Sequence, residues 1–206
     1  MGDGRKERKS ERQMKSVALK THHQAEERRS KFWIYGTGIV LILALIGTVT
    51  SVMLAEKKNE NQLTAAAQKP IDGVQSSTGL SQTHNSTPMT PTELPPVGGD
   101  HAPTWTQCGI YTTPINTSGA VHSLEHGAVW VTYRPDLPQK QIDILTKAAK
   151  LNPYQLLSPY PGLASPVVAT AWGKQLKLES AEDPRLAVFL KAYLQGPQTP
   201  EPGASC

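Results

Sequence analysis

An uncharged, mostly apolar run of 23 residues at positions 33–55 constrains this chain more than any other sequence feature. A helix needs about 20 such residues to cross the hydrocarbon core of a bilayer, so the run predicts one transmembrane helix. Residues 1–31 carry ten Lys/Arg against five Asp/Glu, whereas residues 56–58 hold two lysines and one glutamate. Because Lys and Arg concentrate on the cytoplasmic side, we expect a cytoplasmic N-terminal tail and an extracytoplasmic C-terminal part.

A cleaved signal peptide is the alternative interpretation of this run. The apolar core of a signal peptide is shorter, and a small-residue cleavage site follows it directly. The nearest such site, three alanines at 65–67, begins ten residues beyond the run. The sequence therefore favours an uncleaved, single-pass anchor in the cell membrane.

The formal net charge of +4 is unevenly distributed along the chain. Residues 56–206 hold eleven Lys/Arg and twelve Asp/Glu, so the positive charge belongs to the tail 1–31. Such a tail is attracted to anionic lipid head groups, by on the order of 1 kcal/mol for each cation near the surface. The part beyond the span is too weakly basic to predict nucleic-acid binding.

Composition changes again near position 95. Residues 56–94 are rich in Ser, Thr, Gln and Pro and nearly lack large apolar side chains, so they predict a flexible, disordered linker. Short motifs within it, such as residues 71–74, could still dock on the domain that follows. Residues 95–206 are the part able to bury a core, and their length is typical of one small domain.

Strand and helix patterns mixed along residues 95–206 predict a small extracytoplasmic α+β domain. Residue type and apolar spacing predict three strands and two helices, the strands at 128–133, 166–172 and 175–178, and the helices at 139–151 and 184–194. A hairpin turn is expected at residues 173–174. Asp183 should cap the last helix and Pro184 should begin it.

The chain has two cysteines, Cys108 and Cys206, and both lie in the part expected outside the cytoplasm. Thiols are usually oxidised there, so the sequence predicts a disulfide that ties the proline-rich tail 198–206 to the domain. Closing so long a loop can stabilise a fold by up to about 4 to 5 kcal/mol. The alternative is that Cys108 is a thiolate ligand of a metal ion.

Four of the six histidines lie within about forty residues: His84, His101, His122 and His126. Neutral imidazole is the commonest metal ligand in proteins, and His122 and His126, four positions apart, would share one face of a helix. We expect His101, His122 and His126 to bind a metal ion and His84 to close the site as the linker docks. Glu125 is expected to orient an imidazole from behind the ligands.

The identity of the metal follows from the ligand types. Three or four imidazoles without a free thiolate suit Cu(II) or Zn(II), and a nearby thioether such as Met89 would favour Cu(I). Copper has the higher intrinsic affinity for such sites. Binding of copper, or of zinc, outside the cytoplasm is therefore the leading hypothesis.

Several longer motifs resemble one bacterial family, domain of unknown function 3105: PPVGGDH at 95–101, WTQCGIY at 105–111, VHSLEHGAVW at 121–130, LSPYPG at 157–162 and PEPG at 200–203. The resemblance implies an N-terminally anchored envelope protein, found mainly in actinobacteria, and it implies no activity. The four clustered histidines fall where the family pattern carries histidine. The segment around His84 fits that pattern least closely.

Three other functions stay open. Residues 122–126 spell HxxEH, the signature of a zinc hydrolase with Glu125 as general base, but the strand expected after Gly127 leaves little room for the active-site helix. An enzyme is therefore the less expected outcome.

The histidines could instead bond to backbone carbonyls or Glu125 without a metal. Lastly, the domain could be an accessory subunit of an envelope complex that contacts its partner through aromatic residues, namely Trp105, Trp130, Trp172 and residues 159–161.

Overall fold

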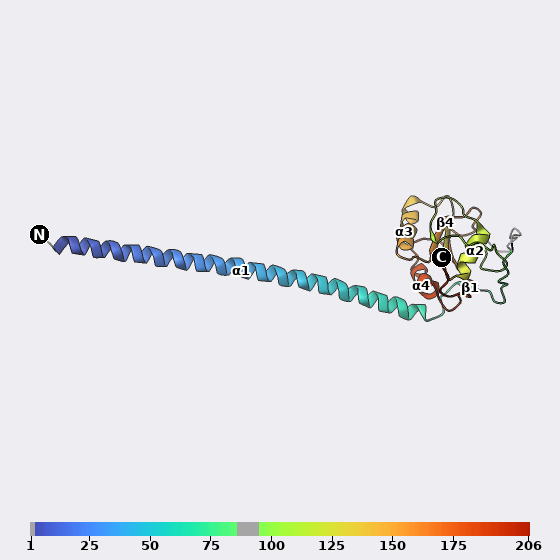
Figure 1. Ribbon diagram of the computed structural model, residues 1–206, viewed down its shortest axis with the longest axis horizontal. Coiled ribbons are helices and arrows are strands. Elements are labelled where there is room, and N and C mark those ends of the chain that lie inside the picture. Colours follow the sequence, from blue (N-terminus) through green and yellow to red (C-terminus); the bar gives the residue numbers. More distant parts are fainter. Residues whose placement is uncertain (1–2, 86–94) are drawn as a thin grey trace. The chain divides into compact units, whose positions relative to one another are not determined.

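The computed structural model describes residues 3–85 and 95–206, and before position 41 it describes side chains only at positions 20, 32, 33, 35, 37 and 38. The chain divides into two compact units, Met1–Lys58 and Asn59–Cys206. The second unit contains the sheet and all of the shorter helices, which are labelled in Figure 1.

The first helix, α1, runs from Asp3 to Ala67 and includes the whole apolar run 33–55. Large apolar side chains of that run, among them Leu41 and Leu54, are exposed. Across the described residues, the apolar stretches of the helices all fall short of what is needed to cross a membrane. The span at 33–55 stays a prediction.

Six strands form one mixed sheet in the order β1-β6-β5-β3-β4-β2. Their bounds are Val74–Ser76 for β1, Gly109–Ile110 for β2, Val129–Tyr133 for β3, Gln155–Pro159 for β4, Val167–Ala171 for β5 and Lys174–Leu178 for β6. Strands β3 and β4 are parallel, and helix α3 (Gln139–Lys150) connects them, as a parallel pair requires. Strands β5 and β6 form an antiparallel hairpin whose turn contains Gly173 at φ 65°. Glycine adopts this left-handed conformation without steric cost.

Helices cover both faces of the sheet. Alternation along β3 sends Val129, Val131 and Tyr133 to one face, where they pack with residues of α3 and of α4 (Pro184–Tyr193). Trp130 points to the opposite face and packs with apolar residues of α2 (Thr117–Glu125). The domain is therefore a three-layer α+β structure, with α2 alone against the second face among the described helices.

The predicted α+β class is confirmed, and the five predicted elements of the domain form within about two residues of their expected bounds. Asp183 caps α4 by accepting the Arg185 N–H at 2.9 Å, and Pro184 begins the helix, both as predicted.

The predicted disulfide between Cys108 and Cys206 also forms, which excludes Cys108 as a thiolate ligand. Trp130 and Trp172 are buried and so are unavailable to a partner, while Trp105 is exposed.

The segment 56–94 differs from the expected linker where the structure describes it. Helix α1 continues through it to Ala67, and β1 pairs with β6 through the register of Val74 with Leu176. Within the segment 71–74, Val74 pairs at the edge of the sheet and Ile71 packs against the core. The domain accordingly begins before position 95.

Candidate metal centre

Helix α2 is short, and its beginning and end are set by individual residues. The Asn116 side chain caps it by accepting the Gly119 N–H at 2.8 Å, and Gly127, at φ 94°, turns the chain away after it. Gly119 lets the loop through Thr106 approach closely, since an added Cβ would lie 2.7 Å from the Thr106 hydroxyl. The helix is therefore held tightly by its surroundings, and seven of its nine residues are buried.

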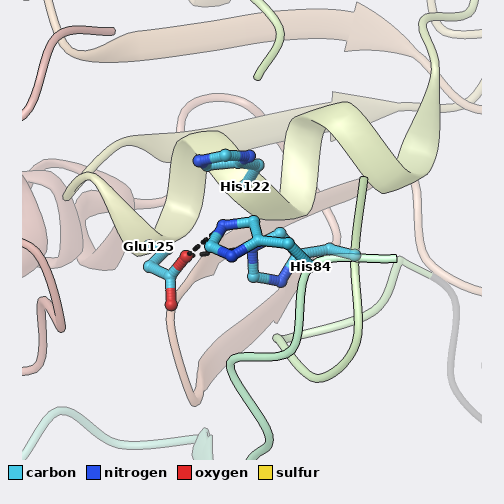
Figure 2. Close-up of side chains that lie close together, drawn as sticks. His84, His122 and Glu125 are labelled. Carbon is cyan, nitrogen blue, oxygen red and sulfur yellow. Dashed lines mark ion pairs between the residues drawn. The ribbon is translucent and has the colours of Figure 1, made fainter. Parts of the chain in front are cut away.

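Four side chains that can ligate a metal ion meet beside α2: His84, His101, His122 and Glu125. One ligand atom from each lies within 4.8 Å of all the others. His122 and Glu125 come from the same face of α2, three positions apart, as Figure 2 shows. His84 reaches the cluster from the opposite side of the view, on a separate segment.

The segments that carry His84 and His101 pair with each other in an isolated parallel bridge. The Asn85 N–H donates to the His101 carbonyl at 2.8 Å, and the His101 N–H donates to the Thr83 carbonyl at 3.0 Å. Because of this bridge, residues 83–85 are held beside the loop that carries His101. His84 therefore lies beside His101, in the same group of side chains that could hold a metal ion.

Glu125 is the centre of the cluster. Its Oε2 lies 2.9 Å from His101 Nε2 and 3.4 Å from His84 Nε2. Glu125 and His101 are both fully buried. Within the described part of the chain, the two carboxylate oxygens of Glu125 and Nε2 of His101 have no hydrogen-bond partner of acceptable geometry. A buried carboxylate without hydrogen-bond donors is costly, so a cation bound between these atoms would offset that cost.

Backbone carbonyls fix which imidazole nitrogen faces the cluster. His101 Nδ1 lies 2.7 Å from the Gly99 carbonyl oxygen, and His122 Nδ1 lies 2.7 Å from the Ala102 carbonyl oxygen. A carbonyl only accepts, so each Nδ1 carries the hydrogen and donates it. In the neutral ring this leaves the Nε2 lone pair free to bind a metal ion. The same arrangement orients the histidine ligands of known metal sites.

The electrostatic surroundings keep His122 in the form that binds metals. Burial lowers the pKa of His122, and the hydrogen bond to the Ala102 carbonyl partly opposes that effect. The neighbouring His126, His101 and His84 each lower the pKa further. His122 is therefore neutral at neutral pH, with its lone pair available.

His126 lies beside the cluster but is not one of its four members. It follows the last residue of α2, its Nδ1 hydrogen-bonds the Ser205 carbonyl, and its Nε2 lies 3.6 Å from Glu201 Oε2. Its ring nonetheless packs on the His122 ring, with centroids 4.6 Å apart. Glu125, rather than His126, thus belongs with His84, His101 and His122 to the group of side chains that could hold a metal ion, and His126 lies beside that group.

His126 keeps a helical backbone conformation and its ring stays beside that of His122, but its Nδ1 is bound by the Ser205 carbonyl of the C-terminal tail. The spacing of His122 and Glu125 by three positions was a signal that these two side chains share a face of the helix. The arrangement does not match HxxEH, which needs His126 as ligand and Glu125 as base. Met89 lies outside the described residues.

Residues 82–206 match the family described as "Protein of unknown function (DUF3105)". Searches of the curated proteins and of the solved structures found no match. The expected membrane anchor and actinobacterial distribution stay predictions. The match covers more than half of the chain and includes every residue of the cluster, so this chain belongs to the DUF3105 family.

Proposed function

We propose that this domain binds one divalent metal ion through His84, His101, His122 and Glu125. The observation that carries the proposal is the buried Glu125 carboxylate, which faces imidazole nitrogens and has no hydrogen-bond donor of good geometry among the described residues. A cation between these atoms would satisfy the carboxylate and the lone pairs at once. The donation of Nδ1 hydrogens to backbone carbonyls supports the same assignment.

Zinc(II) and copper(II) fit the three nitrogens and one oxygen of this ligand set. Both favour imidazole, and zinc also accepts a carboxylate at about 2.0 to 2.2 Å. Copper(I) is less suited, because both cysteines are in the disulfide and a carboxylate is a hard ligand. With four protein ligands the site would be closed, which is typical of a structural or metal-carrying role rather than of catalysis.

The decisive experiment is metal analysis of the full-length chain, purified without a histidine tag and titrated with Zn(II) and Cu(II). We expect about one ion per chain, with binding lost in His122→Ala. His126→Ala is the comparison variant, because it removes an adjacent imidazole that is not one of the four proposed ligands. It should bind the ion more weakly than the wild-type chain without losing it, since its ring supports that of His122.

A wild-type chain that binds no more metal than His122→Ala would end the proposal. His101 and Glu125 would then form a buried ion pair with a structural role. Equal loss of metal in His122→Ala and His126→Ala would instead restore His126 as a ligand.

We also propose that the chain is anchored in a membrane through residues 33–55, with the N-terminus in the cytoplasm. The uncharged sequence of this run and its exposed apolar side chains support the proposal. Extraction of cell membranes with alkaline carbonate tests it. Release of the chain into the soluble fraction would count against an anchor, whereas retention until detergent is added would support one.

A further inference from the structure

The C-terminal tail, residues 195–206, lies against the end of α2 that carries Glu125. It has no regular secondary structure, so its position depends on individual contacts. The Glu201 N–H donates to the Glu125 carbonyl at 3.1 Å, and the Gln195 N–H donates to the Gly127 carbonyl at 2.8 Å. The first of these bonds satisfies a carbonyl group that the helix end leaves without a partner. The tail thus provides the hydrogen-bond donor for the backbone carbonyl of Glu125, the residue that carries the carboxylate.

The same tail also holds the residue behind the cluster. His126 Nδ1 donates to the Ser205 carbonyl, and the Tyr154 hydroxyl donates to the neighbouring Ala204 carbonyl at 2.9 Å. Because the His126 ring packs on the His122 ring, the position of the tail is transmitted to a second ligand.

The disulfide connects this tail to a second segment, the loop through Thr106 and Cys108, which contacts α2 at another place. Cys206 bonds to Cys108, which lies two residues after Thr106. The Ser123 hydroxyl of α2 donates to the Thr106 carbonyl at 2.5 Å, and the Thr106 N–H donates to the Gly119 carbonyl at 3.0 Å. The two segments joined by the disulfide therefore both bind α2, one along its length and the other at its end.

We infer that the disulfide-linked tail is a positioning element of the metal centre, and that metal affinity depends on the bond between Cys108 and Cys206. The inference rests on the proposed function. Once the bond is lost, the tail keeps only its noncovalent contacts, and Glu125 and the ring of His126 lose a fixed support. Changes to groups that orient ligands typically weaken metal binding by about 10- to 100-fold.

Two altered chains test the inference in the full-length protein. The double variant Cys108→Ser with Cys206→Ser removes the bond and keeps the tail. Glu201→Pro keeps the bond but removes the N–H that binds the Glu125 carbonyl. Zn(II) affinity is measured by competition, and the visible absorption of bound Co(II) reports the geometry of the ligands. We expect both variants to bind Zn(II) about 10-fold or more weakly, with an altered Co(II) spectrum.

Asp183→Ala is the control for stability alone, because it removes the cap of α4, which lies on the other face of the sheet. It should lower the melting temperature but leave the Zn(II) affinity and the Co(II) spectrum unchanged. A folded double variant with wild-type affinity and spectrum would overturn the inference and leave the metal site intact. Should the double variant not fold, unchanged binding in Glu201→Pro would overturn it instead. A wild-type chain that binds neither ion would refute the proposed function and this inference together.

Discussion

The two faces of the sheet are built from different kinds of residue. The face toward α3 and α4 is almost wholly apolar and includes Leu145, Phe189 and alternate residues of every central strand. The face toward α2 combines Trp130 and Trp172 with buried polar residues and ends in the histidine and glutamate cluster. The comparison indicates that the first face supplies most of the stability, whereas the second carries the proposed metal centre. Four predictions test this division.

The largest effect is expected on the apolar face. Phe189 is fully buried between α4 and the sheet, so Phe189→Ala should destabilise the domain by about 3 to 5 kcal/mol. Denaturant unfolding followed by circular dichroism measures this loss. Zn(II) binding by the fraction that remains folded should be unchanged, and a parallel loss of affinity would show that the two faces are coupled.

On the α2 face, the bound metal should provide stability that the side chains alone do not. At a free metal concentration of about 100 times Kd, binding to the folded state alone adds about 2.7 kcal/mol. The melting temperature of the wild-type chain should rise accordingly with Zn(II), and that of His122→Ala should not. An equal rise in both chains would place the binding elsewhere.

Removing the buried charge should separate function from stability. Glu125→Gln keeps the size of the side chain but replaces a buried carboxylate that has no hydrogen-bond donor with a neutral amide. The metal-free chain should be unchanged or more stable by up to about 2 kcal/mol, while metal affinity falls. Denaturant unfolding in the presence of a chelator tests the first part. A loss of more than about 3 kcal/mol would mean that the carboxylate and His101 form a structural ion pair.

The smallest effect concerns the cap of α4. Asp183 accepts the Arg185 N–H and contacts the Arg185 guanidinium at 2.7 Å, and the hydrogen bond to that side chain is the main cause that lowers the pKa of Asp183. Asp183→Ala should cost about 1 kcal/mol at neutral pH, mostly through the lost cap, since the ion pair is partly exposed.

The pH dependence of this cap has a defined sign. Because the pKa is lower in the folded state, the contribution of Asp183 is present above its unfolded pKa of about 4 and is lost as pH falls through the folded value. Melting temperatures of the wild-type and Asp183→Ala chains should therefore converge below about pH 4. A difference between the two melting temperatures that persists at lower pH would contradict the assignment of this stability to the ionised Asp183 side chain.

The apolar face was the more predictable one. Its helices show amphipathic spacing and, for α4, a cap followed by proline, which are local signals. Strand β4 was missed because its sequence, QLLSP, shows no alternation and ends in proline. The strands β1 and β2 have three and two residues, too few for any pattern, and only pairing with neighbours makes them strands.

On the α2 face, the sequence identified the histidines and the disulfide but not their final roles. The meeting of Glu125 with His84 and His101 depends on segments far from α2 in the sequence, and the position of His126 depends on a tail almost eighty residues away. Neither is encoded in local spacing. The lack of donors around the carboxylate is likewise a property of the packed structure alone.

The bond between Cys108 and Cys206 has a consequence for the redox behaviour of the protein. Coupling between two equilibria is reciprocal, so a disulfide that strengthens metal binding is itself protected by the bound metal to the same degree. A tenfold difference in metal affinity would correspond to about 30 mV in the reduction potential of this two-electron pair. The metal-loaded chain would then keep its disulfide under conditions that reduce the empty one, and reduction would in turn favour release of the metal.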